Sequence, residues 1–168
     1  AAERAELARF HRPRAAGAAG LWRATGLALA ATWALVAPGP GSRAFGVALL
    51  ALVAWLAPRD VARRTVRSTD LPRFSAVAML AGYGWLTVAG VAWAVTGVPT
   101  TRAAHDLLVH TVFLGFAMSM VLAHAPVILP SVLRRPLPYR RVLWAPLVVL
   151  HAGLAVRAGG ALVGQTRL

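Results

Sequence analysis

The sequence predicts an all-α protein, a polytopic transmembrane helical bundle with five spans and a cytoplasmic N-terminus. Apolar residues make up 58% of the 168 residues, a larger share than soluble domains carry, and the mean hydropathy is +0.64. These residues are concentrated in five segments, at about 24–37, 44–58, 74–97, 104–130 and 142–164. A helix needs about 20 apolar residues to cross a bilayer, a length that the last three segments reach and the first two approach.

The arginines alternate in number between the connections of these segments. Five precede the first segment, five lie between the second and third, and four lie between the fourth and fifth. The other two connections and the C-terminal tail hold one arginine each. This alternation follows the positive-inside rule and predicts an N-terminus in the cytoplasm and a C-terminus outside. Lysine and asparagine are absent while alanine and arginine abound, which is typical of GC-rich bacterial genomes and favours a bacterial inner membrane.

The formal net charge of +13 is therefore interpreted as a topology signal. Arginines at the cytoplasmic surface attract anionic lipid headgroups, each with about 1 kcal/mol. No basic platform interleaved with aromatic residues accompanies them, so we expect the lipid bilayer and its anionic headgroups as partners, and no nucleic acid.

The chain is expected to form one membrane domain, residues 1–168, without internal repeats. Residues 1–20 are predicted to be a cytoplasmic lead that is amphipathic or frayed. The first two spans are joined by Pro38-Gly39-Pro40-Gly41, which predicts a tight helical hairpin. A signal peptide is the alternative interpretation of the first segment, but its arginine-rich lead is long and no cleavage site is evident.

The later spans carry three further signals. Gly82, Gly84 and Gly90 predict a small-residue face for close packing of the third helix. The fourth helix is expected to kink or end at its prolines, which are Pro126, Pro130, Pro136 and Pro138. Most of the six tryptophans lie near the predicted span ends, as interfacial anchors do.

Ionisable residues inside spans are costly in lipid and mark candidate functional sites. The fourth span holds Asp106, His110 and His124, and the fifth holds His151 and Arg157. His105, at the outer edge of the fourth span, and His11, in the lead, are expected in water. The chain has no cysteine, which excludes disulfides, iron–sulfur clusters and thiolate-ligated haem within it.

Ideal helix geometry arranges the residues of the fourth span. His110 and His124 are fourteen residues apart, which places them within about 40° of one face and about 21 Å apart along the axis. Ala117 lies midway on that face and leaves room beside the helix. Asp106 lies one turn outward of His110, where it could accept a ring N–H and fix the imidazole tautomer.

The fifth span runs antiparallel and brings its own polar residues alongside. His151 is expected roughly 13 Å from the inner surface and His124 roughly 9 Å, so the two form a predicted inner pair. Arg157 is expected near the level of His110. An imidazole pair suits one haem iron, and an arginine could neutralise haem propionates. These residues fit a zinc ion less well, because zinc requires three or four ligands. The alternative is that the histidines only hydrogen-bond between helices and Asp106 pairs with Arg157.

One stretch resembles a known family. It runs from His110-Thr-Val-Phe-Leu-Gly115-Phe116 through Met120 and His124-Ala-Pro126-Val-Ile-Leu-Pro130 to Arg135-Pro136-Leu137. This pattern, within residues 104–160, is similar to NnrS-type membrane proteins, whose wider relatives are the haem–copper oxidase catalytic subunits. The resemblance implies haem b, with His110 as the first candidate ligand and His124 as the second. Those families have about twelve spans, and this chain lacks their copper-binding histidine pair and its neighbouring tyrosine.

Three classes of function follow. The first is a haem-binding membrane protein in electron transfer or nitric oxide response, with His110, His124 and His151 as candidate iron ligands and Asp106 and Arg157 as further cofactor-binding residues. The second is a small transporter or channel subunit whose polar path is lined by histidine and arginine. The third is a structural or assembly subunit without chemistry of its own. In each case we expect a homo-oligomer or a subunit of a larger membrane complex, rather than an enzyme acting alone.

Overall fold

The computed structural model describes residues 14–135 and 138–162, with side chains over 20–135 and 138–160. All regular secondary structure in these ranges is helical, which confirms the all-α prediction. The elements are α2 (Arg14–Val36), α3 (Pro38–Leu56), η1 (Ala57–Arg59), α4 (Ala62–Thr65), α5 (Asp70–Thr96), α6 (Arg102–His110), the π-helical segment η2 (Thr111–Ala117), α7 (Met118–Leu133), η3 (Arg141–Leu143) and α8 (Trp144–Leu162).

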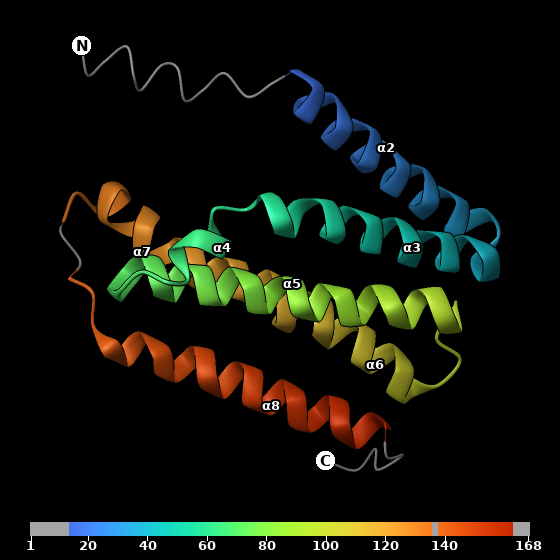
Figure 1. Cartoon of the computed structure of the whole chain (residues 1–168). Helices are drawn as coiled ribbons and strands as arrows, with labels where there is room; N and C mark the ends of the chain where they lie inside the picture. Colours follow the sequence, from blue (N-terminus) through green and yellow to red (C-terminus); the bar gives the residue numbers. More distant parts are fainter. Residues whose placement is uncertain (1–13, 136–137, 163–168) are drawn as a thin grey trace.

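Consecutive long helices run in opposite directions along the bundle (Figure 1). Since α6, η2 and α7 follow one another without a break, they form one rod, here called the α6–α7 rod. Helix α5 is central, because it contacts α3 on one side and η2 and α7 on the other. In its apolar window, 44% of the residues are buried, compared with 11% in that of α8. Helix α8 is therefore attached to the bundle through a small part of its surface.

Within the described residues, four helical stretches are long and apolar enough to cross a membrane: Pro38–Arg59, Asp70–Thr96, Arg102–Leu133 and Arg141–Gly160. They coincide with the second to fifth predicted spans, so a multi-pass membrane protein is confirmed at this level. The first predicted segment, 24–37, is also helical and lies in α2, but α2 is not one of the four. That helix begins at Arg14, ten residues before the expected start of the span. Residues 1–13 of the predicted lead lie outside the described residues.

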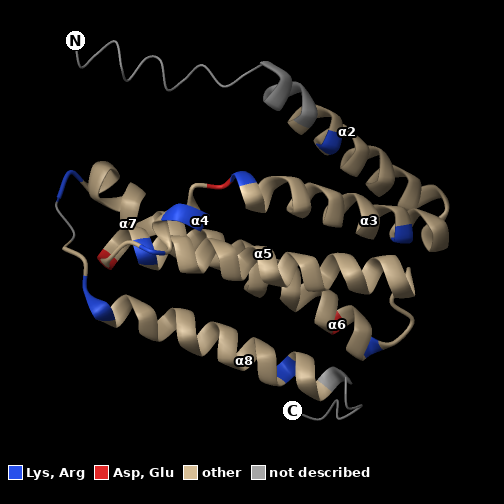
Figure 2. Ribbon diagram, in the orientation of Figure 1, with Lys and Arg blue, Asp and Glu red and all other residues tan. Residues whose placement is uncertain are grey.

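The ends of the bundle differ in charge. The connections α3–α5 and α7–α8, which the sequence makes rich in arginine, lie at one end (Figure 2, left). The connections α2–α3 and α5–α6, with one arginine each, lie at the other end. The alternation of arginines along the sequence thus becomes a separation of charge between the two ends.

The predicted hairpin between the first two segments is present. Ala37 alone separates α2 from α3, and its N–H donates to the Trp33 carbonyl at 2.8 Å. The N–H of Gly41 donates to the Ala37 carbonyl at 2.9 Å. A Cβ on Gly41 would lie 2.4 Å from the backbone of Ala34, so only glycine allows the two helices to approach this closely.

Close glycine contacts also join α5 to its neighbours. A Cβ on Gly90 would lie 2.9 Å from Leu50 of α3, and one on Gly82 would lie 3.2 Å from the Ser119 Cβ of α7. The close packing predicted at these two glycines is confirmed, but they pack against different helices and so do not share one face. The third glycine, Gly84, is exposed, and a Cβ added there would have no neighbour within 4 Å. Its assignment to a packing face is therefore wrong.

Two apolar clusters fill the spaces around α5. Leu49 and Val53 of α3 pack with Tyr83 and Leu86 of α5. On the opposite side, Phe74 of α5, which is fully buried, lies edge-on to Trp144 of α8 with ring centroids 5.6 Å apart. The second cluster therefore connects α5, α7 and α8 at the arginine-rich end.

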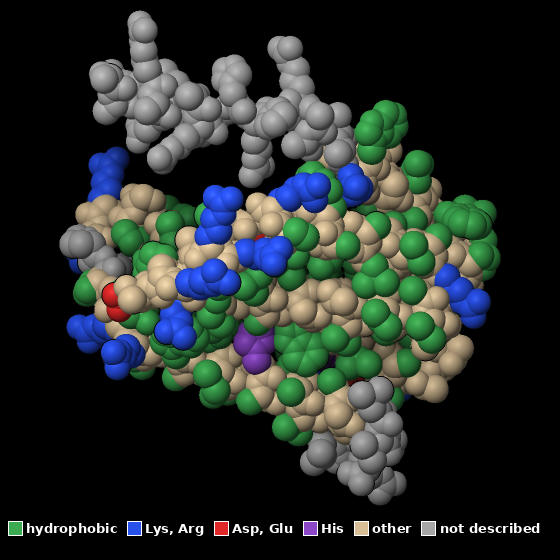
Figure 3. Space-filling model, viewed as in Figure 1, with side chains coloured by type: hydrophobic (Ala, Val, Ile, Leu, Met, Phe, Trp, Pro, Cys, Tyr) green, Lys and Arg blue, Asp and Glu red, His purple; other side chains and the backbone are tan. Residues whose placement is uncertain are grey.

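The outward faces of the helices are apolar as well, as Figure 3 shows for one side of the molecule. Exposed large side chains occur on all the long helices, among them Val91, Val121, Ile128, Val149 and Val156. In water such a surface would be unfavourable, whereas lipid tails solvate it well, and helices satisfy their own backbone hydrogen bonds there. A bilayer is therefore the environment that this surface fits.

The fourth span ends within its cluster of prolines, as the sequence predicts. Helix α7 continues through Pro126 and Pro130 and ends at Leu133, before Pro136. It stops at Arg134, which has left-handed backbone angles and donates its N–H to the Pro130 carbonyl. A second irregularity of this rod lies in η2, where no proline is present.

Candidate functional site

The first polar cluster, here called the central cluster, consists of Trp85, Ser119 and His151. Each residue lies near the middle of its candidate span, on α5, α7 and α8 respectively. The Trp85 Nε1–H donates to Nδ1 of His151 at 2.8 Å, and the Nε2 of His151 lies 3.4 Å from the Ser119 Oγ. The indole and imidazole planes are nearly parallel, at 5°. Three helices thus meet through one imidazole.

The chemistry of these groups sets the direction of each bond. An indole N–H can only donate, so His151 accepts at Nδ1 and, as a neutral ring, carries its proton on Nε2. This proton is directed to Ser119, whose hydroxyl donates to the Gly115 carbonyl at 2.5 Å. Both ring nitrogens of His151 are therefore occupied, and the chain of donors ends on a backbone carbonyl of η2.

Gly115 makes this arrangement possible. A Cβ at this position would lie 2.5 Å from the Cβ of Trp85 and 3.0 Å from Leu154 of α8. With hydrogen instead, Trp85 lies directly against the backbone of η2 and its indole reaches His151. π-Helical segments within α-helices are frequent at functional sites, and this one has the central cluster at its C-terminal end.

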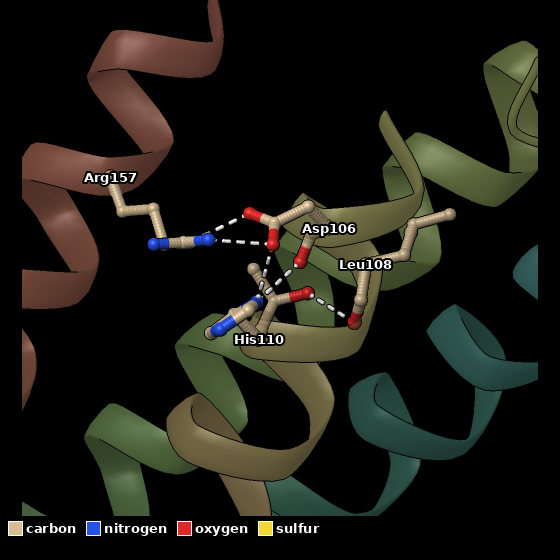
Figure 4. A network of polar contacts seen from close by, with 5 residues as sticks. Asp106, Leu108, His110 and Arg157 are labelled. Atoms are coloured by element: carbon tan, nitrogen blue, oxygen red, sulfur yellow. Dashed lines mark hydrogen bonds and ion pairs between the residues drawn. The ribbon is translucent and has the colours of Figure 1, made fainter. Parts of the chain in front are cut away.

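The second cluster, here called the end cluster, joins α6 to α8 (Figure 4). Arg157 forms a bidentate ion pair with Asp106, with its Nε 2.7 Å from Oδ2 and its Nη2 2.6 Å from Oδ1. The Nδ1 of His110 lies 2.7 Å from the Asp106 carbonyl and 3.3 Å from the Asp106 carboxylate. Both neighbours of Nδ1 are acceptors, so in the neutral ring this nitrogen carries the proton and Nε2 keeps its lone pair.

The predicted contact between Asp106, His110 and Arg157 is therefore confirmed, while its place in the outer half of the membrane stays a prediction. The sequence placed Asp106 one turn from His110 and Arg157 near the same level, and these three side chains are in contact. About 9 Å of α8 separates Arg157 from His151, as six residues of helix predict. Both clusters thus lie on the interface between the α6–α7 rod and α8.

The predicted inner pair of His124 and His151 is not formed. His151 contacts Ser119, which precedes His124 by five residues, or about 7.5 Å of helix. His124 is exposed and its Nδ1 lies 2.8 Å from the Met120 carbonyl of its own helix. The prediction is wrong because it counted the depth of each histidine from the end of its predicted span, whereas side-chain packing sets the relative depth of the two helices.

The same-face relation of His110 and His124 also fails. It assumed 100° per residue throughout, but residues 111–117, with Ala117 as the last, are π-helical and turn less at each residue. His105 is exposed, and His11 lies outside the described residues.

Sequence reasoning missed Trp85 and Ser119. Trp85 was grouped with the interfacial tryptophans, although it is sixteenth of the 27 residues of α5. A tryptophan in the middle of a span needs a partner for its N–H, and that requirement was a usable signal. Ser119 gave no comparable signal, since serine in lipid is commonly satisfied by its own helix.

Among the described residues, no group of three or more His, Asp or Glu side chains could hold a metal ion. A haem needs only one or two protein ligands, so this finding does not bear on it.

The fold and its apolar surface define the class, a helical multi-pass membrane protein with polar clusters inside the bundle. The chain belongs to the family described as domain of unknown function DUF8744, whose model matches residues 1–168. Comparison with curated proteins and with solved structures found no match.

We predict that Gly115→Ala will lower the thermal stability of the detergent-purified protein and speed hydrogen exchange in α8. The added methyl must displace Trp85 and so break its bond to His151, with overpacking in such sites costing about 1–3 kcal/mol. Gly153→Ala in α8 is the matched control, because nothing lies within 4 Å of a Cβ there. Equal behaviour of the two variants would show that Trp85 does not depend on Gly115.

We predict coupling between Asp106 and Arg157 in a double-mutant cycle followed by thermal unfolding in detergent. Arg157→Ala leaves the Asp106 carboxylate without its partner and should lower the midpoint by several degrees. Adding Asp106→Asn should recover part of that loss, because no unpaired charge then remains. Purely additive effects would mean that the ion pair does not stabilise the docking of α8.

Proposed function

We propose that this protein binds haem b through His110 and takes part in electron transfer or nitric oxide response in the bacterial inner membrane. The observation that supports this proposal is the state of the His110 ring. Its Nδ1 is held by the carbonyl and carboxylate of Asp106, and its Nε2 makes no hydrogen bond with any described residue. A ligating histidine is typically oriented in this way, by an acceptor at the nitrogen that does not bind the metal.

The other predicted ligands fit a haem to different degrees. His151 does not fit, since Trp85 and Ser119 occupy both of its ring nitrogens. His124 has a bonded Nδ1 like that of His110, but it lies on an exposed part of α7, away from the end cluster. Of the three predicted ligands, His110 is therefore the one that we propose as the ligand of the haem iron.

Arg157 and Asp106 have supporting roles in this proposal. Arg157 is about 43% exposed at its side chain, so it could meet a propionate while it keeps Asp106 ionised. Asp106 would hold the His110 proton on Nδ1. A bound haem would supply a redox-active iron within the bilayer. We also propose that the protein forms a homo-oligomer or is a subunit of a larger membrane complex. The resemblance of residues 104–160 to NnrS-type proteins selects the same histidine.

We further propose that the N-terminus is cytoplasmic and that α2 forms a fifth span. The gathering of arginines at one end of the bundle supports this orientation.

Reporter fusions provide the measurement. Alkaline phosphatase fused within the α3–α5 connection should be inactive, and the same enzyme fused at the α5–α6 connection should be active. The reverse pattern would overturn the orientation. A fusion at the N-terminus that behaves like the one at the α5–α6 connection would exclude α2 as a span.

The visible spectrum of the detergent-purified protein tests the haem proposal. After growth with a haem precursor, we expect a Soret band that shifts on reduction with dithionite. His110→Ala should reduce the ratio of haem to protein at least about tenfold, because the iron loses its protein ligand.

His105→Ala is the matched control, since this histidine lies on the same helix and is exposed. It should leave the spectrum unchanged. A colourless wild-type protein that also fails to bind added haem would end the proposal and leave a transporter subunit or a structural role. Equal loss in the His105 and His110 variants would contradict ligation by His110.

A further inference from the structure

A groove of ≈ 1040 Å³ opens at the arginine-rich end of the molecule. It lies between α2, the C-terminal end of α3 and the segment around α4. Four arginines line it, namely Arg59, Arg63, Arg64 and Arg67. All four are exposed, and their positions at the end of the candidate span Pro38–Arg59 place the groove where lipid headgroups would lie.

The positive charge of the groove exceeds what its acidic residue can offset. Asp60 is the one carboxylate among four lining arginines, and both of its oxygens accept hydrogen bonds from neutral groups. Oδ2 accepts from the Tyr83 hydroxyl at 2.6 Å, and Oδ1 accepts from the Ala62 N–H at 2.8 Å. Within the part of the chain that the structure describes, Arg63, Arg64 and Arg67 form no ion pair.

The same bonds of Asp60 hold the groove in shape. Tyr83 is buried in α5, so its bond to Asp60 ties the α3–α4 turn to the central helix. Ala62, the first residue of α4, is only 1% exposed. Arg67 follows Arg63 and Arg64 by four and three residues, a spacing that places side chains on one side of a helical turn. The guanidinium groups thus extend from a fixed backbone.

Trp55 adds an aromatic surface to the groove. The guanidinium carbons of Arg23 and Arg59 each lie 5.3 Å from the centre of its ring, and Arg59 also donates to the Trp55 carbonyl at 2.9 Å. Tryptophan at the end of a span favours the level of the headgroups. The groove therefore combines an apolar side facing the span with cationic groups facing water.

We propose that this groove binds the phosphate headgroup of an anionic phospholipid. Guanidinium groups bind phosphate oxygens in a bidentate manner, and three of them lie here without a carboxylate partner. The position at the end of a span and the apolar lining beside Trp55 favour a lipid over a soluble phosphate, because acyl chains can continue along α3. This site is independent of the end cluster and of any haem.

Binding of dioctanoyl phosphatidylglycerol to the full chain in dodecyl maltoside tests the proposal, with thermophoresis as the measurement. We expect saturable binding and little binding of dioctanoyl phosphatidylcholine. The variant Arg63→Ala/Arg64→Ala/Arg67→Ala should bind roughly 100-fold more weakly, since each arginine near the membrane contributes about a factor of five. The charge reversal Arg67→Glu should also weaken binding, and it changes only one residue of the chain.

The matched control removes three arginines at the same end but outside the groove, Arg135→Ala/Arg140→Ala/Arg141→Ala. Its affinity should stay within about threefold of the wild type. Equal losses in both triple variants would overturn the groove as a site, because general charge attraction would then explain the binding. Glycerol phosphate that binds as tightly as the lipid would overturn the lipid as its ligand, and non-saturable binding would overturn both.

Discussion

The contact between Trp85 and the backbone of Gly115 is the constraint on which the position of α8 depends. It places an indole in the middle of the bundle, where its N–H can reach His151. An unsatisfied donor at this depth would be costly, so the bond favours one depth and one rotation of α8 relative to α5. Arg157, six residues further along α8, then meets Asp106. One glycine in a π-helical segment therefore underlies both polar clusters.

Much of the fold followed from the sequence, because the signals involved are local. Hydropathy identified the four stretches that can cross a membrane. The Pro-Gly repeat at 38–41 identified a tight hairpin, in which Gly41 lies against the backbone of Ala34. The distribution of arginines anticipated the two unlike ends of the bundle. The π-helical segment was not predictable in this way, since residues 111–117 contain no proline and have the composition of an ordinary apolar helix. The proline cluster at 126–138 located the end of α7, which lies at Leu133, although the helix continues through Pro126 and Pro130.

The candidate site was predictable only where it depended on neighbours along one helix or on complementary charge. Asp106 and His110 are one turn apart, and an arginine in lipid needs an anion, so the end cluster could be expected. The partner of His151 could not, because the relative depth of α7 and α8 depends on packing between Trp85, Gly115 and Ser119 that no local pattern encodes. The arginine-lined groove likewise depends on tertiary structure, since only the fold gathers four arginines around a single carboxylate, Asp60, which Tyr83 holds in place.

The small buried share of α8 has a consequence for biogenesis. A helix as apolar as α8 can be released into lipid and remain inserted on its own, since its backbone bonds are internal. Its docking is then a second, separate event, in which one apolar cluster, a few hydrogen bonds and one ion pair hold α8 in place of a broad apolar interface. During synthesis, the earlier helices can assemble around α5 before α8 leaves the translocon. Quality control in the membrane would accordingly detect a defect in the polar clusters as an undocked last helix, with topology intact and the histidine, tryptophan and aspartate of the interface exposed to lipid.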